Sequence, residues 1–322
     1  MRRMPGAAGN GAEGGIRMLD FNIPDFEREL AKLYEAGDLA AVEDYLKKTL
    51  RYVESTMTVS GCSSCECHDE KALENSDYRR EEIEWVVTRS KGIIAVSEEL
   101  GALYRDTGRP AEALDCFLRA KDELREAGQE RSEAAAMAAL NVGTVQRMLN
   151  KGELALRDLG EAYRMLEALG GHEEAMANLW NNVGLVRLDR GEPTEAAASF
   201  ERALSYGPTG EAAAAIWNNV ALAAMARGDR TAAEGAVDKA MEVLEETGGP
   251  QLASAVNTKA VLRFYAADYA GALGFFERAA ELTKELYGAG AQYASICRNC
   301  AAAAEKAGNA EKAALWRTQA AG

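Results

Sequence analysis

Residues with almost no side chain recur at three fixed places in six successive segments of this chain. With Ala177 as position 1 of the third segment, these places are positions 8, 20 and 27. Position 8 is Gly101, Gly143, Gly184, Ala221, Ala260 and Ala301; position 20 is Ala113, Ala155, Ala196, Ala233, Ala272 and Ala313; position 27 is Ala120, Ala162, Ala203, Ala240, Ala279 and Ala320. Because small residues let two helices approach closely, each segment is predicted to form a helix–turn–helix pair.

The third segment shows the pattern in detail. Its two amphipathic stretches meet at a turn around Gly191, and Pro208 is expected to end the second helix because proline has no N–H to donate. Trp180 and Phe200 are expected to fill the space that remains where Gly184 lets the helices approach. A pair of this length cannot bury its apolar faces alone, so the pairs must stack on one another.

This register resembles the tetratricopeptide repeat (TPR), a helix–turn–helix unit of 34 residues, over residues 77–322. Successive position-8 residues are 37 to 42 residues apart, so the helices are expected to be longer than in the standard unit. Long-repeat TPR proteins such as kinesin light chain and the bacterial peptide-sensing regulators are similar. The resemblance implies an all-α, right-handed solenoid of about six antiparallel pairs, with the first helix of each pair on the concave face.

The residues before the array are expected to form three segments. Residues 1–18 are rich in Gly, Ala and Arg and are interpreted as a disordered tail. Residues 19–56 have helical spacing on both sides of a turn at Gly37, which predicts a degenerate N-terminal hairpin. Residues 57–76 are a polar, cysteine-rich insert. At the other end of the chain, Arg317 is the one charged residue at position 24, and we expect it to face solvent on the last helix.

The charge and the apolar content restrict partners and location. A formal net charge of −14 disfavours binding to nucleic acid or to an anionic membrane. No apolar run approaches the ~20 residues that span a bilayer. Arg2 and Arg3 have no apolar stretch behind them, so no secretory signal is predicted. The expected location is the cytoplasm, where the six cysteines are thiols or metal ligands.

Asparagines recur in the middle of the predicted first helices at position 6. One more stands at position 2, which lies one turn earlier on the same side of a helix. They are Asn141, Asn182, Asn219 and Asn299, with Asn178. Asparagine is a mediocre helix former, so the recurrence needs a reason. Each amide offers one acceptor and two donors, and the resemblance to long-repeat TPR proteins implies that such amides hold the main chain of an extended peptide. Alternatively, the amides bond between neighbouring helices and stabilise the stack.

Hydrogen bonds from four amides, at ~1 kcal/mol each, fall short of the ~8 kcal/mol of a micromolar complex. Apolar anchors are therefore expected at positions 9 and 12 of the same helices: Leu185, Leu222, Met225, Val261 and Phe264. Arg105 and Arg147, at position 12 of the first two segments, are candidates for binding a carboxylate; the alternative is that they lie on solvated faces.

Cys62, Cys65, Cys67 and His68 offer four soft ligands within the polar insert, as a tetrahedral zinc ion requires. Adjacent Cys67 and His68 cannot easily reach one metal, however, and a second Cys-x-x-Cys pair is missing downstream. A disordered, oxidation-prone loop and a thiol-redox role are the alternatives. A further pair, Cys297 and Cys300, is expected to be buried in the core.

Motifs for catalysis are missing: the chain has two histidines and no P-loop, nucleophile elbow or His-Glu-x-x-His sequence. The predicted function is therefore a non-enzymatic scaffold or adaptor that binds an extended peptide or a partner's tail in the concave groove. The alternative is a metal- or redox-responsive adaptor that uses the loop from Cys62 to His68. No cofactor is expected besides zinc at that loop. The exposed end helices of a solenoid also allow a homo-oligomer.

Overall fold

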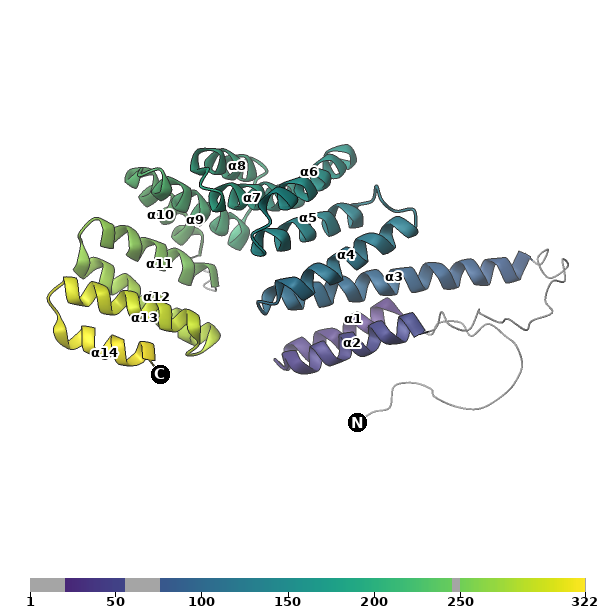
Figure 1. Ribbon diagram of the computed structural model, residues 1–322, viewed down its shortest axis with the longest axis horizontal. Helices are drawn as coiled ribbons and strands as arrows, with labels where there is room; N and C mark the ends of the chain where they lie inside the picture. Colours follow the sequence, from purple (N-terminus) through teal and green to yellow (C-terminus); the bar gives the residue numbers. More distant parts are fainter. Residues whose placement is uncertain (1–20, 56–75, 245–249, 322) are drawn as a thin grey trace. The chain divides into compact units, whose positions relative to one another are not determined.

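The computed structural model of this protein describes residues 21–55, 76–244 and 250–321. These residues form 14 α-helices and no strand, which confirms the all-α prediction. The predicted tail, residues 1–18, and the predicted insert up to residue 75 lie outside the described residues. The chain divides between Glu130 and Arg131 into two compact units, and each contains antiparallel helices (Figure 1).

Unit 1 contains the N-terminal hairpin and the first repeat pair. Its helices are α1 (Ile23–Glu35), α2 (Leu39–Ser55), α3 (Ser76–Asp106) and α4 (Pro110–Glu126). The side chain of Asn22 accepts the N–H of Asp25 at 3.2 Å and so caps the start of α1. Phe26 and Leu30 of α1 are buried, as are Val42 and Leu46 of α2. Helices α1 and α2 also contact each other.

A charged cluster ties α2 to the turn between α3 and α4. Arg109, in that turn, donates from Nη1 to Oε2 of Glu43 on α2 at 2.7 Å. Its guanidinium lies over the ring of Tyr104, 4.2 Å from the ring centroid. The bond from Arg109, followed by the bond from Lys47, lowers the pKa of Glu43 to about 2. The hairpin and the first repeat pair are thus joined by charge-assisted hydrogen bonds as well as by apolar packing.

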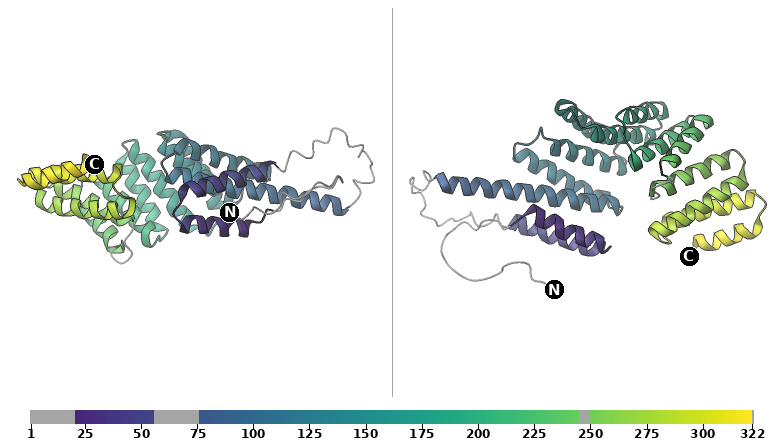
Figure 2. Two further views of the ribbon diagram at one scale, coloured as in Figure 1. Left: turned by 90° about the horizontal axis from the view of Figure 1, so that it is seen from below. Right: turned by 180° about the vertical axis from the view of Figure 1, so that it is seen from behind.

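Unit 2 contains the other five repeat pairs. Its helices are α5 (Glu133–Met148), α6 (Gly152–Leu169), α7 (Glu173–Asp189), α8 (Pro193–Ser205), α9 (Gly210–Ala226), α10 (Arg230–Leu244), α11 (Pro250–Tyr265), α12 (Tyr269–Tyr287), α13 (Ala291–Lys306) and α14 (Ala310–Ala321). Each helix packs against the next in sequence, and the first helices α5, α7, α9 and α11 also contact one another in order. In Figure 1, α6, α8 and α10 follow the outer side of this unit, with α5, α7 and α9 inside them. Figure 2 shows the same alternation from two other sides. The surface of α5, α7, α9, α11 and α13 is called the first-helix face below.

The small residues at positions 8, 20 and 27 lie at the helix contacts, as predicted. All are buried except Ala320, which is half-buried in the last helix. A Cβ on Gly101 would lie 2.7 Å from the ring of Phe117, and a Cβ on Gly143 would lie 2.8 Å from Cγ of Leu159. Position 8 therefore makes room for the large side chain at position 24 of the partner helix. On the last helix, the side chain of Arg317 is 58% exposed, as expected.

Trp180 and Phe200 both pack in the pair formed by α7 and α8, as predicted. Phe200 is fully buried, while Trp180 is half-buried and packs against the core that includes Phe200. The Trp180 ring meets Tyr163 of α6 edge-on, with centroids 5.6 Å apart, and is covered by the guanidinium of Arg202 at 3.9 Å. The tryptophan therefore contacts the core of its own pair and also joins that pair to the preceding one.

Each turn between the two helices of a pair passes through a left-handed residue at position 15. Glycine occupies it in four pairs, for example Gly191 with φ +74°, while Asn150 and Ala267 have φ of 58° and 60°. For alanine this conformation costs roughly 1–2 kcal/mol. The turn before α12 is therefore strained at Ala267.

Candidate binding surface

Several of the predicted amides form hydrogen bonds within the array. Asn219 of α9 donates from Nδ2 to Oδ1 of Asn181 on α7 at 2.8 Å, and Asn218 donates to Oγ of Ser254 on α11 at 3.2 Å. Asn182 donates to the backbone oxygen of Asn178, one turn earlier on α7, at 2.9 Å. The alternative interpretation, bonding between neighbouring helices, is therefore observed for Asn219.

Asn299 of α13 differs from these amides, because its side chain has no hydrogen-bond partner among the described residues. The bond equivalent to the one between Asn219 and Asn181 would join Asn299 to Asn257 of α11. That bond is not formed, and Oδ1 of Asn257 is buried without a partner in the described structure. Helices α7 and α9 contact each other at a few residues, and α11 and α13 do so less, if at all, among the described helices. The amide of Asn299 is half-buried and unpaired in the described part of the chain.

A cavity of about 200 Å³ lies beside this open amide. It is lined by Val261, Phe264, Tyr265, Phe276, Asn299 and Ala302. The structure thus brings together Asn299 and two of the predicted apolar anchors, Val261 and Phe264. We call this space the Asn299 cavity. It places a half-buried amide, without a side-chain partner among the described residues, beside an apolar wall.

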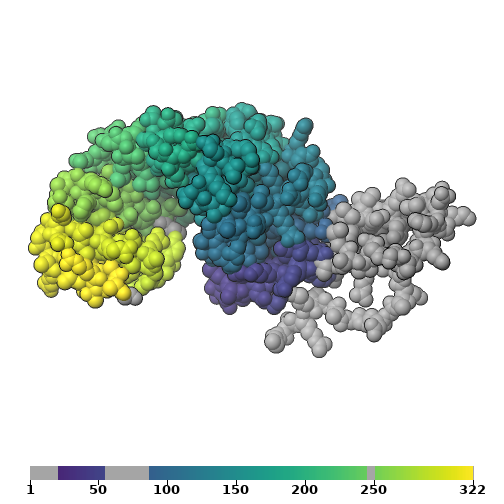
Figure 3. Space-filling view, viewed as in Figure 1, coloured from purple at the N-terminus to yellow at the C-terminus, as the bar shows by residue number. Residues whose placement is uncertain are grey.

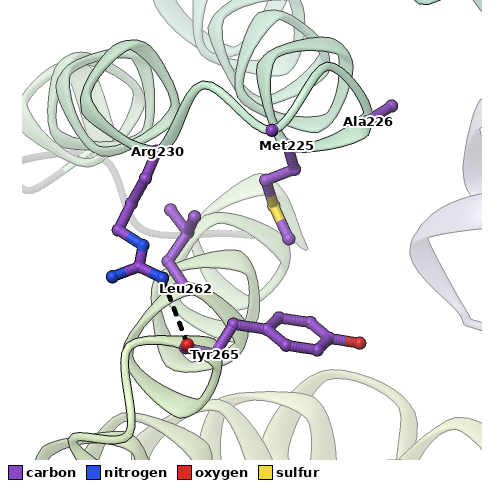
Figure 4. A pocket seen from close by; sticks show the side chains of 6 residues that line it. Met225, Ala226, Arg230, Leu262 and Tyr265 are labelled. Carbon is purple, nitrogen blue, oxygen red and sulfur yellow. Dashed lines mark hydrogen bonds between the residues drawn. The ribbon is translucent and has the colours of Figure 1, made fainter.

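A larger cavity of about 430 Å³ adjoins the first, and Tyr265 lines both. Its lining residues are Met225, Ala226, Gly228, Arg230, Leu262 and Tyr265 (Figure 4). We call it the Arg230 cavity. Of its residues, only Met225 was predicted. Tyr265 is 71% exposed and directly follows the predicted anchor Phe264 on α11, and a second aromatic residue beside that anchor is the signal that could have identified it. Figure 3 draws all atoms of this region, and side chains fill the spaces that the ribbon diagram leaves between α12, α13 and α14.

The other predicted apolar anchors do not line either cavity. Leu185 and Leu222 are both half-buried, on α7 and α9. Leu185 packs against the core formed by α7, α8 and α9, which includes Phe200 and Ile216. Asn141 is half-buried on α5 and has interactions of its own. Leu185 thus contributes to the packing of the stack.

The two candidate arginines each pair with an aspartate of this chain. Arg105 donates from Nε to Oδ1 of Asp106 at 2.8 Å, in unit 1. Arg147 donates from Nη1 to Oδ2 of Asp189 on α7 at 3.0 Å, in unit 2. A ligand carboxylate would have to displace the aspartate at either position.

A buried lysine was missed at the sequence level. Lys259 of α11 occupies position 7, where α5, α7 and α9 have Val142, Val183 and Val220. Its side chain is 7% exposed, and Nζ donates to Oδ1 of Asp238 on α10 at 2.6 Å. A charged residue at an apolar repeat position was the available signal. The bond joins two consecutive repeat pairs.

The predicted metal ligands Cys62, Cys65, Cys67 and His68 lie outside the described residues. In the described part of the chain, no cluster of His, Cys, Asp and Glu could hold a metal ion. Cys297 and Cys300 are fully buried on α13, which confirms that they belong to the core, and burial raises the pKa of both thiols. Their thiols are therefore poor nucleophiles. None of the described helices combines the length and the apolar character needed to cross a membrane.

Comparisons with known proteins point to one family. The tetratricopeptide repeat family matches residues 93–168, while no curated protein matches this sequence. The structure resembles the apo form of the quorum sensor NprR from B. thuringiensis, with 13% identity, a TM-score of 0.58, and coverage of 92% of this chain and 86% of that chain. A tetratricopeptide repeat protein from Parabacteroides merdae has 17% identity and a TM-score of 0.53, with 92% and 91% covered.

PilW, a type IV pilus biogenesis factor, has 18% identity and a TM-score of 0.53, with 70% of this chain and 91% of that chain covered. At these identities the likeness concerns the fold alone. Residues 93–168 thus match the tetratricopeptide repeat family, and the small-residue register, the stacked antiparallel pairs and the structural matches show that the described chain has an all-α helical repeat fold of this type.

Proposed function

We propose that this chain is a non-enzymatic interaction scaffold that binds an extended peptide, or the tail of a partner protein, on the first-helix face of unit 2. One observation carries the proposal: Asn299 has an unpartnered amide beside an apolar cavity that Val261 and Phe264 line. Repeat arrays of stacked helix pairs commonly use such extended faces for binding.

The chemistry of the Asn299 cavity fits a peptide better than an isolated side chain. The amide offers two donors and one acceptor, which match a backbone carbonyl and an N–H. An apolar side chain that becomes buried in the cavity contributes about 1.5–3 kcal/mol, and each hydrogen bond about 1 kcal/mol. A micromolar complex needs about 8 kcal/mol, so the bound segment must continue along neighbouring helices.

The amides of α7 and α9 have a different part in this proposal. Asn219 and Asn181 bond to each other, so they hold the spacing of the helices on which a peptide would lie. The proposal places the protein in the cytoplasm, where free thiols such as Cys297 and Cys300 persist. It includes no nucleic-acid partner, because a net charge of −14 repels a phosphate backbone.

Selection from a displayed library of random peptides tests the proposal. The wild-type protein should enrich sequences with an apolar residue at a fixed place. Ala302→Leu places a larger side chain in the cavity from an exposed helical position, and it should abolish the enrichment. Asn299→Ala should weaken binding of the enriched peptides about fivefold to thirtyfold, the loss of one or two hydrogen bonds.

Gln292→Ala is the matched control, since it removes an exposed amide from the same helix without touching either cavity. Its binding should equal that of the wild type. If no peptide is enriched, or if the enriched peptides bind the Ala302→Leu and Asn299→Ala variants as well as the wild type, the proposed function is wrong.

A further inference from the structure

The Arg230 cavity has a composition that differs from that of the Asn299 cavity. Its lining includes three apolar side chains, Met225 of α9 with Leu262 and Tyr265 of α11, and the guanidinium of the exposed Arg230 (Figure 4). The cavity volume of about 430 Å³ falls within the ~300–1,000 Å³ of sites that hold small molecules. An apolar enclosure with one charged group is the usual lining of such a site.

The charge of Arg230 is not neutralised within the described structure. One N–H, at Nη2, donates to the backbone oxygen of Tyr265 at 3.2 Å, and no described residue forms an ion pair with the guanidinium. A guanidinium has five N–H donors, so donors remain. The bond to Tyr265 also fixes the direction of the side chain at the end of α11.

The acidic residues of the two adjoining turns are engaged elsewhere. Oδ1 of Asp229 accepts the N–H of Ala232 at 3.0 Å and caps α10. Asp268 caps α12 by accepting the N–H of Gly271 at 3.0 Å, and it lies 3.5 Å from Arg263. Neither carboxylate is paired with Arg230, although the whole chain carries an excess of negative charge.

We propose that the Arg230 cavity binds a small molecule with an apolar body and a single carboxylate. Met225, Leu262 and Tyr265 would enclose the body, and a thioether and a phenol ring suit an aromatic group in particular. Arg230 would hold the carboxylate, which a guanidinium matches in shape and charge.

The charge of the ligand follows from the charge of the protein. One arginine balances one carboxylate, whereas a phosphate ester carries more charge than this cavity neutralises. With a net charge of −14, the protein repels multiply charged anions more strongly than a monoanion. The apolar walls then supply most of the affinity, and the carboxylate supplies the selectivity.

Titration with naphthylacetate and its neutral counterpart naphthylacetamide, followed by NMR shifts or calorimetry, tests the inference. The wild type should bind the acid about tenfold more tightly than the amide, the effect of one charge-assisted hydrogen bond. Arg230→Gln should remove this preference. Arg227→Gln makes the same change at an exposed arginine of the same turn that does not line the cavity, and it should keep the preference.

Two further variants locate the binding. Tyr265→Ala, at an exposed side chain, should weaken both compounds alike because it removes one apolar wall. Ala302→Leu, which blocks only the Asn299 cavity, should leave naphthylacetate binding intact. The inference is overturned if the wild type binds neither compound, binds both equally, or responds to Arg227→Gln as to Arg230→Gln. These outcomes do not depend on the peptide selection, so the two proposals fail separately.

Discussion

Helices α7 and α9 and helices α11 and α13 use the same repeat positions in different ways. In the first region, the amide at position 6 of one helix bonds to the amide at position 5 of the preceding first helix, as Asn219 does to Asn181. In the second region the corresponding residues are Asn299 and Asn257, and no such bond forms. The comparison shows that one amide pattern can join neighbouring helices in one place and leave an amide unpaired in another.

The different packing of the first helices explains this contrast. Helices α7 and α9 contact each other at a few residues and α11 and α13 less than that, and residues of α11 and α13 line the Asn299 cavity. On α11, position 6 is Thr258, whose hydroxyl donates to the backbone oxygen of Ser254 on the same helix at 3.0 Å. The hydrogen-bonded ladder that runs from α7 toward α11 therefore ends before α13.

The largest expected effect tests whether the two regions share one kind of core. Phe200 in the first region and Phe276 in the second are both buried at position 24. Phe200→Ala and Phe276→Ala should each lower the free energy of unfolding by about 3–5 kcal/mol, because each leaves a large void. Urea unfolding monitored by circular dichroism measures this. A cost below 1 kcal/mol for either variant would contradict the assignment of that ring to the core.

The next largest effect concerns position 8, which is glycine on α7 in the first region and alanine on α11 and α13 in the second. A Cβ added to Gly184 would overlap the ring of Phe200. In the repeat pair that contains Phe276, position 8 is Ala260, which already has a Cβ. Gly184→Ala should destabilise the protein by about 1–3 kcal/mol through overpacking, although alanine is the better helix former. Gly160→Ala is the control, because the only atom near its added Cβ is the end of the flexible Arg164 side chain. A stability gain in Gly184→Ala would show that the close contact is relaxed in solution.

The turns provide a third contrast. Gly191 lies between α7 and α8 and Ala267 between α11 and α12, both with a positive φ. Gly191→Ala should cost roughly 1–2 kcal/mol, and Ala267→Gly should gain a similar amount less the flexibility that glycine adds to the unfolded chain. Thermal unfolding of both variants provides the measurement. Destabilisation by Ala267→Gly would mean that residue 267 is not left-handed.

The smallest effect bears directly on the two amides. Asn219→Ala leaves Oδ1 of Asn181 without its donor and should cost about 1 kcal/mol of stability. Asn299→Ala breaks no hydrogen bond within the described structure, so the unfolding free energy should change by less than about 0.5 kcal/mol. Equal losses in the two variants would remove the distinction between a structural and an available amide.

The repeat framework could be predicted because it depends on residue size at fixed intervals. The positions of Gly101, Gly143 and Gly184 identified the helix contacts without any knowledge of the tertiary structure. The left-handed turn was also foreseeable at Gly191, but not at Ala267, where alanine occupies a place that usually needs glycine. Such a substitution becomes visible only when the backbone is known.

The candidate site could be predicted in part. Asn299, Val261 and Phe264 follow from the stripe of positions on the first helices, and they meet at one cavity. Sequence alone could not distinguish Asn299 from Asn219, because the difference is the distance between α11 and α13, which many side chains set together. Arg230 was missed for a related reason: it lies at the start of a second helix, outside the predicted stripe.

The strained turn at Ala267 has a consequence for evolution and for engineering. It lies two residues after Tyr265, the side chain that borders both cavities. A single codon change to glycine should raise the stability of the protein, yet it would also make the segment that orients this tyrosine more flexible. A laboratory lineage selected only for heat resistance should acquire that change early, and one selected for ligand retention should avoid it.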